Sequence, residues 1–268
     1  MNILNKLYKS NIINFIPNYF LRKLKKFFNY YFVEIPIEKL PKNNYPRTIT
    51  LEGQEKLIKN FNTKNYIPSI SCPYLVQLLK LIFNKQSKEY NFLDFGGENI
   101  DYYFYLKKNF KNLRYFYFNQ KHHNQIIAEL KKKYLLKDLI ILNSLDDIKK
   151  NNYNFINLGS VIHYIEDYKL ALNSLMETNP EYFFLTAQVY YENKVNEKGN
   201  IIVKQVNTFP HINFFYFFEY EPFLKIFKLK NFELIFKALN FTDNINFGNF
   251  DKKCGKIEYC DLLMKKVN

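Results

Sequence analysis

Short apolar segments alternate with helix-like segments through the middle of the chain. The apolar segments have the length of buried strands, and between them apolar residues recur every three or four positions, as on one face of a helix. Strands are predicted at residues 90–95, 113–118, 139–142, 155–158 and 182–188. Helices are predicted at residues 101–109, 122–134 and 168–177. This alternation predicts an α/β fold with a mostly parallel sheet covered by helices on both faces.

The pattern changes on either side of this alternating region. Upstream, helical spacing predicts two helices at residues 49–64 and 71–85. Downstream, a strand, a helix opened by Pro222 and a final strand are predicted at residues 201–206, 219–230 and 256–265. The polar, turn-rich segments at residues 191–200 and 240–255 are predicted to be loops.

The first 48 residues form a separate unit in this interpretation. Apolar residues between positions 18 and 33 follow a helical spacing, and Arg22 with three lysines occupies the other positions, which predicts a basic amphipathic helix. Such a helix can contact anionic lipid or a partner, or it can dock on the main domain, which we favour. Prolines in residues 34–48 indicate an extended linker. We therefore divide the chain into an extension with linker, 1–48, and one domain, 49–268.

Composition narrows the classes of partner. The net charge is +14, but Arg22, Arg47 and Arg114 are the only arginines, and the other 36 of the 39 basic residues are lysines. Lysine lacks the planar fork that binds phosphate in a bidentate way, and AT-rich coding explains a lysine excess, so no specific nucleic-acid partner is expected. Three cysteines without a C-x-x-C pair indicate neither a disulfide framework nor a zinc site. We do not expect the N-terminal residues to form a signal peptide, so a cytoplasmic location is expected, with a peripheral inner-membrane contact through residues 18–33 left open.

The end of the first predicted strand carries the strongest candidate site, Asp94-Phe95-Gly96-Gly97. A parallel α/β sheet binds ligands at the carboxyl ends of its strands. Two adjacent glycines allow close approach of the backbone, and the N-terminus of the next helix presents free N–H groups to a carboxylate. Asp94 can accept from an ammonium group. The third glycine of the dinucleotide pattern G-x-G-x-x-G is missing, which disfavours NAD.

These residues carry a resemblance to a family. Residues 93–97 resemble motif I of class I S-adenosylmethionine (SAM)-dependent methyltransferases, and residues 155–167 resemble the segment at and after the fourth strand of those enzymes. Together with the aromatic stretch 208–218, they resemble an uncharacterised bacterial family associated with surface-polysaccharide biosynthesis. The resemblance covers roughly residues 75–265. It implies a Rossmann-like sheet of order 3-2-1-4-5-7-6, with the seventh strand antiparallel, and SAM as cofactor.

The resemblance also implies a set of cofactor-binding residues. They are Asp94, Gly96, Gly97, Asn119, Asn143, Ser144, Gly159 and Ser160. Asn119 stands where the family usually has an acidic residue that binds both ribose hydroxyls, so weaker ribose binding is expected. Glu98 stands where relatives have a small residue, and its charge would repel the SAM carboxylate unless it points to solvent or pairs with a lysine.

His163 is the candidate catalytic base, because a hydroxyl acceptor benefits from a base close to the methyl group. A histidine packed at a helix start is the structural alternative. His122 and His123 are expected to flank adenosine or solvent, and His211 lies in the aromatic stretch, which forms either a lid over the acceptor or core. Asp146 and Asp147 are interpreted as residues at a helix start rather than metal ligands, and no metal site is expected.

Three functions follow from these features. The leading hypothesis is a SAM-dependent methyltransferase that acts on a small, sugar-based hydroxyl or amine acceptor in surface-polysaccharide biosynthesis. The alternative is a non-catalytic Rossmann-like scaffold in a polysaccharide-assembly complex, motivated by Glu98, Asn119 and the basic N-terminal helix. Methylation or binding of nucleic acid, motivated by the net charge of +14, is the third.

Overall fold

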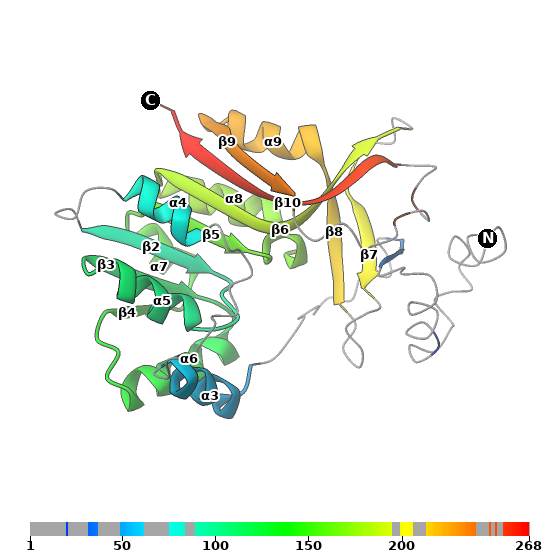
Figure 1. The fold of residues 1–268 in the computed structure, drawn as a ribbon. Coiled ribbons are helices and arrows are strands. Elements are labelled where there is room, and N and C mark those ends of the chain that lie inside the picture. The colour runs from blue at the N-terminus through cyan, green and yellow to red at the C-terminus, as the bar shows by residue number, and fades with distance from the viewer. Residues whose placement is uncertain are drawn as a thin grey trace.

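The computed structural model describes residues 20, 32–36, 49–61, 75–83, 89–194, 199–205, 213–239, 247, 250 and 254–267. Within these residues the chain forms one 10-stranded sheet with helices packed on it (Figure 1). Most of the predicted basic helix 18–33 lies outside the described residues. Its predicted end is wrong, because Phe32–Glu34 forms a strand, β1, rather than a helix.

The central part of the sheet has the predicted order. Its strands lie side by side as β4-β3-β2-β5-β6-β10-β9. Numbered along the alternating region, this is 3-2-1-4-5-7-6, and β10 runs antiparallel to both of its neighbours. The strands are β2 (Tyr90–Phe95), β3 (Leu113–Phe118), β4 (Leu139–Leu142), β5 (Phe155–Gly159), β6 (Tyr182–Asn193), β9 (Phe232–Leu239) and β10 (Cys254–Lys266). The Rossmann-like α/β prediction is therefore confirmed.

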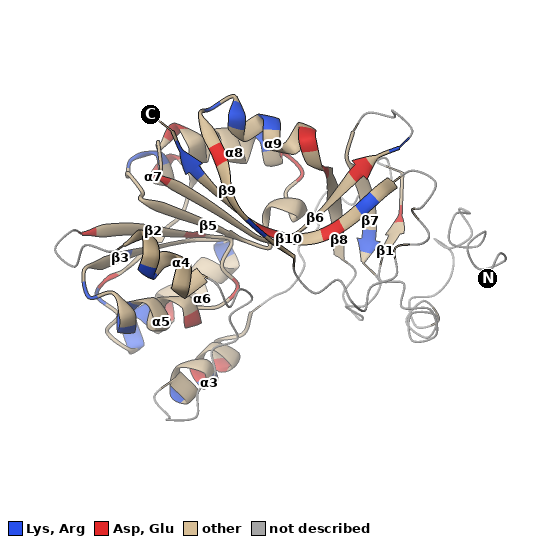
Figure 2. Ribbon diagram, turned by 45° about the horizontal axis from the view of Figure 1, so that its top comes forward, with Lys and Arg blue, Asp and Glu red and all other residues tan. Residues whose placement is uncertain are grey.

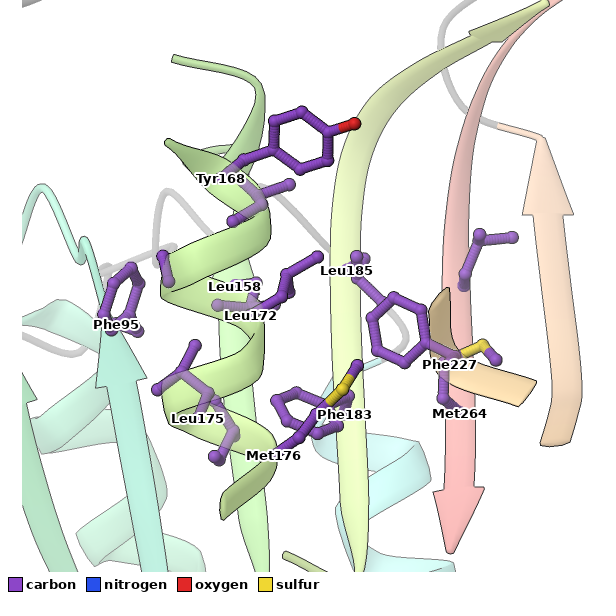
Figure 3. Packing of buried hydrophobic residues seen from close by; sticks show 14 of the residues in the cluster. Phe95, Leu158, Tyr168, Leu172, Leu175, Met176, Phe183, Leu185, Phe227 and Met264 are labelled. Carbon is purple, nitrogen blue, oxygen red and sulfur yellow. The ribbon is translucent and has the colours of Figure 1, made fainter. Parts of the chain in front are cut away.

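Alternate residues of the central strands point to two separate cores. Phe92 belongs to the core under α3 to α6, whereas its neighbour Leu93 belongs to the core under α7 to α9. In Figure 3, side chains of α8 such as Leu172 and Leu175 meet Leu158 and Leu185 of the sheet. The helices are α3 (Leu51–Phe61), α4 (Leu75–Ile82), α5 (Asp101–Asn109), α6 (Lys121–Lys133), α7 (Leu145–Lys149), α8 (Tyr168–Glu177) and α9 (Tyr220–Lys228).

A second set of strands extends the sheet beyond β6. The strand β8 (Asn213–Glu219) pairs in parallel with the far end of β6, and β7 (Ile201–Gln205) and β1 follow it outward. Figure 1 shows β6 and β10 running from the central sheet into this extension. Aromatic residues such as Phe215, Phe217 and Phe32 form a third core there. The aromatic stretch 208–218 is thus strand and core in its described part, 213–218.

A bulge in β6 divides the two parts of the sheet. Ala187 has a φ of 50°, and the pairing of β6 with β10 shifts register between Cys260 and Leu262. The buried carboxylate of Asp261 accepts the N–H of Ala187 at 2.8 Å, so the unpaired backbone group of the bulge is satisfied. A bulge bends a strand and increases its twist. This bend turns the far half of β6 toward β8.

Besides β1, sequence patterns missed three features of the sheet. No strand was predicted at β9 or at β8, and β6 was predicted to end at Gln188, five residues early. The predicted loop 191–200 therefore begins within a strand. No helix among the described residues has the length and apolar character needed to cross a membrane.

Candidate functional site

Asp94 lies at the carboxyl end of β2 and is fully buried. Its Oδ2 accepts the hydroxyl of Tyr115 at 2.6 Å, and its Oδ1 accepts Nδ2 of Asn157 at 3.0 Å. Burial raises the pKa of this carboxyl to about 6, against the opposing effect of the two hydrogen bonds. Asp94 therefore links β2 to its two neighbouring strands, β3 and β5, and it does not reach solvent.

The two glycines after β2 are required by close packing. Gly96 has a φ of +77°, and a Cβ there would lie 2.3 Å from Cγ2 of Val161. A Cβ on Gly97 would lie 2.2 Å from Oδ2 of Asp94. The turn after β2 is thus held between the buried carboxylate and the loop that follows β5.

The carbonyl of Gly97 faces the end of β3. It accepts the hydroxyl of Tyr117 at 2.6 Å and Nδ2 of Asn119 at 2.7 Å. Oδ1 of Asn119 accepts the N–H of Gln120 at 2.7 Å. Both ends of the Asn119 amide are therefore engaged within the protein, although the family resemblance implied a ribose contact for this residue.

Helix α3 closes one side of this corner. Gln54 is buried, and its Nε2 donates to Oδ1 of Asn99 at 2.6 Å while its Oε1 accepts the N–H of Ile100 at 3.4 Å. The N-terminus of α5 is thereby tied to α3. The side chain of Glu98 is exposed.

The ends of β3 and β4 are joined by Asn124. Its Oδ1 accepts the N–H of Asn119 at 3.0 Å, and its Nδ2 donates to the carbonyl of Leu142 at 2.7 Å. Asn143 is exposed, and Ser144 is the N-cap of α7, accepting the N–H of Asp147 at 3.1 Å. The prediction that Asp146 and Asp147 stand at a helix start is confirmed.

Unpartnered polar atoms lie near the end of β5 and on the part of β6 that pairs with it. Gly159 pairs with Thr186, and the N–H of Ser160 donates to the Thr186 carbonyl at 3.0 Å. A Cβ on Gly159 would lie 3.2 Å from Nδ2 of Asn157 and 3.7 Å from Oγ1 of Thr186. Oδ1 of Asn157 and Oγ1 of Thr186 are buried and have no hydrogen-bond partner among the described residues. Buried polar groups are nearly always hydrogen-bonded, so these two atoms indicate a place for a polar ligand.

His163 lies in the short 3-10 helix η3 (Ile162–Tyr164) and is fully buried. Its ring centroid is 4.3 Å from that of Tyr164 and 4.7 Å from that of Phe215 on β8. Burial lowers the pKa of His163 to about 3, although the neighbouring Gln188 acts in the opposite direction. The ring is therefore neutral at pH 7, and within the described part of the chain neither nitrogen has a hydrogen-bond partner.

Helix α6 carries His122 and His123. His122 is exposed, whereas His123 is buried and its Nε2 accepts the N–H of Ile49 at 3.3 Å. His211 lies outside the described residues.

The structure brings some of the predicted residues together. Asp94, Gly96 and Gly97 meet Asn119 on one side and the loop after Gly159 and Ser160 on the other. Sequence patterns did not single out the polar side chains that connect them, which are Gln54, Tyr115, Tyr117, Asn124, Asn157, Thr186 and Gln188. The one available signal was a polar residue within an otherwise apolar strand, as at Asn157.

Lysine and arginine are distributed over the molecule. In Figure 2 they lie on helices of both layers and on β7 and β10, interspersed with Asp and Glu. Several are paired, such as Lys133 with Glu55 at 2.5 Å and Lys149 with Glu177 at 2.8 Å. A nucleic-acid site gathers basic residues on one face. The described residues show no such concentration.

Sequence comparison identifies no relative: no family model and no curated protein matches the chain. Solved structures resemble it in outline. Coclaurine N-methyltransferase with S-adenosylhomocysteine covers 98% of each chain at 11% identity, with a TM-score of 0.48. A SAM-dependent methyltransferase from Clostridium acetobutylicum covers 82% of this chain and 100% of its own at 10% identity, with a TM-score of 0.48. The 1,6-didemethyltoxoflavin-N1-methyltransferase of Burkholderia thailandensis covers 88% and 95% at 8% identity, with a TM-score of 0.46.

Proposed function

We propose that the chain is a SAM-dependent methyltransferase that acts on a small hydroxyl or amine acceptor, with a sugar as the acceptor class. The observation that carries the proposal is the pair of unpartnered buried atoms, Oδ1 of Asn157 and Oγ1 of Thr186, beside Gly159. They lie near the carboxyl end of β5 and on the part of β6 that pairs with it, and β5 neighbours β2, which carries the glycine corner. Ligands of open α/β sheets bind at this edge.

The residues present fit the cofactor. Asn157 Oδ1 and Thr186 Oγ1 are acceptors for an ammonium group. Ser160, Asn143 and Ser144 complete the proposed set at the ends of β5 and β4. The Oδ1 of Asn119 accepts the N–H of Gln120 and has a second lone pair that can accept a ribose hydroxyl. When bound, SAM supplies an activated methyl group.

His163 is proposed to accept a hydrogen bond from the acceptor hydroxyl or amine. Its ring is neutral because it is buried, so one nitrogen always carries a lone pair. With a pKa of about 3, the ring is a weak base. Its contribution is therefore to orient the acceptor, and positioning supplies much of the acceleration in a transfer of this kind.

Calorimetry with SAM and S-adenosylhomocysteine tests the proposal. Wild-type protein is expected to bind both, and Thr186→Val is expected to weaken binding about tenfold by removing Oγ1. Thr178→Val is the matched control, because Thr178 is also buried but its hydroxyl donates to the Leu175 carbonyl in α8. Absence of binding by the wild-type protein at high micromolar ligand would refute the proposal.

A non-catalytic scaffold is the second candidate, and the engaged amide of Asn119 favours it. In that case the glycine corner is a structural turn, and neither ligand binds in the same titration. A role in surface-polysaccharide biosynthesis, a cytoplasmic location and a peripheral membrane contact through residues 18–33 are further parts of the methyltransferase proposal. Co-sedimentation with anionic vesicles, comparing the full chain with a variant lacking residues 1–31, tests the membrane contact.

A further inference from the structure

The side chain of Gln188 is anchored at one end only. It is fully buried, and its Nε2 donates to the carbonyl of Thr186 at 2.8 Å and to that of Leu158 at 3.4 Å. An amide nitrogen has two N–H groups, so both are used by these carbonyls. The orientation of the amide is thereby fixed. Its Oε1 is buried and has no hydrogen-bond partner within the described ranges.

The ring of His163 adjoins this amide. Helix η3 contacts both β6 and β8, and Gln188 is the polar side chain that acts on the imidazole. Both ring nitrogens of His163 are buried and unpartnered among the described residues. A neutral imidazole has one N–H donor and one lone-pair acceptor. The Gln188 oxygen is an acceptor that lacks a donor, and the histidine holds a donor that lacks an acceptor.

We propose that Gln188 is a positioning residue that accepts the N–H of His163 and so holds the imidazole in one tautomer. The opposite nitrogen is then the lone pair that meets the methyl acceptor, and this part of the inference rests on the proposed function. A single lone pair selects acceptors whose reacting group is a hydrogen-bond donor. Hydroxyls and neutral amines satisfy this condition, whereas tertiary amines and thioethers do not.

The chemistry of the anchor explains why an amide stands at this position. A carboxylate at residue 188 would face the carbonyls of Leu158 and Thr186 with no donor to offer them. A methionine would fill the same volume with neither donor nor acceptor. Glutamine is the side chain of this length that donates to both carbonyls and accepts from the ring.

The tautomer of His163 can be measured directly. Long-range ¹H–¹⁵N correlation spectra of labelled protein at pH 7 distinguish the two neutral tautomers, and His163→Gln assigns the signal among the 4 histidines. Wild-type protein is expected to show His163 in one neutral tautomer, and Gln188→Met is expected to show both. A mixture or a charged ring in the wild-type protein would overturn the inference, even if Gln188→Met fails to fold. An unchanged single tautomer in a folded Gln188→Met would overturn it as well.

A second measurement separates positioning from cofactor binding. With an acceptor that is turned over, Gln188→Met is expected to lower kcat about tenfold or more while the Kd for SAM stays at the wild-type value. Thr178→Val controls for the loss of a buried polar group. Equal kcat in Gln188→Met and wild type would overturn the catalytic part. If the wild-type protein binds no SAM, the proposed function fails, whereas the tautomer measurement still decides the role of Gln188.

Discussion

The carboxylate of Asp94 occupies the place of a side chain at Gly97, since a Cβ at residue 97 would stand 2.2 Å from Oδ2. The carboxylate cannot retreat, because Tyr115 and Asn157 hold its two oxygens. Both residues belong to the motif that the sequence alone indicates as a ligand corner. The glycine is thus required by the aspartate as well as by any ligand.

Gly97→Ala is therefore expected to destabilise the fold by about 2 kcal/mol, the typical cost of forcing extra volume into a packed site. The free energy of unfolding from urea titration measures the effect. Gly255→Ala is the control, because a Cβ there would approach only Glu192, at 3.3 Å and beyond. Equal stability of the two variants would contradict the packing seen at Asp94.

The buried carboxyl of Asp94 is expected to make stability depend on pH. Its pKa is about 6 in the folded protein, against an ordinary value of 3.8, so the folded state binds more protons between these two pH values. Stability from this group is fully present below its ordinary pKa of 3.8 and is lost as pH rises through 6. The free energy of unfolding of Asp94→Asn, minus that of wild type, should rise by about 3 kcal/mol between acidic and neutral pH.

The His163 contribution to stability has the opposite sign, because a lowered histidine pKa loses stability as pH falls from 6.5 toward 3. It is present in both proteins and cancels in the difference. A pH-independent difference between Asp94→Asn and wild type would show that the carboxyl is ionised normally.

Asn119→Asp restores the acidic residue that is usual in class I methyltransferases, yet it is expected to weaken SAM binding. The new carboxylate would face the Gly97 carbonyl, which now accepts Nδ2 of Asn119 at 2.7 Å. Loss of a buried donor costs about 1–3 kcal/mol. Calorimetry with SAM measures the binding, and Asn151→Asp is the control, since Asn151 donates to the carbonyl of Asp147 at 2.8 Å. Tighter SAM binding by Asn119→Asp would contradict this expectation. It would show that residue 119 leaves the Gly97 carbonyl and binds the ribose.

Ala187 in the β6 bulge offers a test of backbone strain. Its φ of 50° is unfavourable for a residue with a Cβ. Ala187→Gly is expected to leave stability unchanged or raise it by up to about 1 kcal/mol, and Ala187→Val to lower it by about 2 kcal/mol. Thermal unfolding of wild type, Ala187→Gly and Ala187→Val gives their order of stability. A Val variant as stable as wild type would mean that the bulge relaxes easily.

The central sheet could be predicted from sequence because its strands are buried on both faces. The β2, β3 and β4 strands and helices α5 and α8 begin and end at the predicted residues. Strand β9 was missed for the opposite reason. Its outward positions include Ile235 and Leu239, which are exposed but apolar, so the alternation of burial has no matching alternation of polarity.

Sequence alone predicts the candidate site only where its geometry depends on a single strand and the turn that follows it. The turn at Gly96 and Gly97 follows from the order of residues along the chain. The contacts of Asn157, Thr186 and Gln188 depend on the register between β5 and β6, which no local pattern encodes. The hydrogen bond from Asn119 Nδ2 to the Gly97 carbonyl depends on the rotamer of the Asn119 side chain. The site's backbone was therefore expected, and its hydrogen-bond network was not.

The continuous strand β6 contributes side chains to both cores of the central sheet and to the third core in the extension. Phe215 reaches the His163 ring from the extension, whereas Asp94 and Gly97 lie at the end of β2 in the central sheet. Substitutions in β7 and β8 can thus alter the surroundings of His163 while the corner at Asp94 stays as it is.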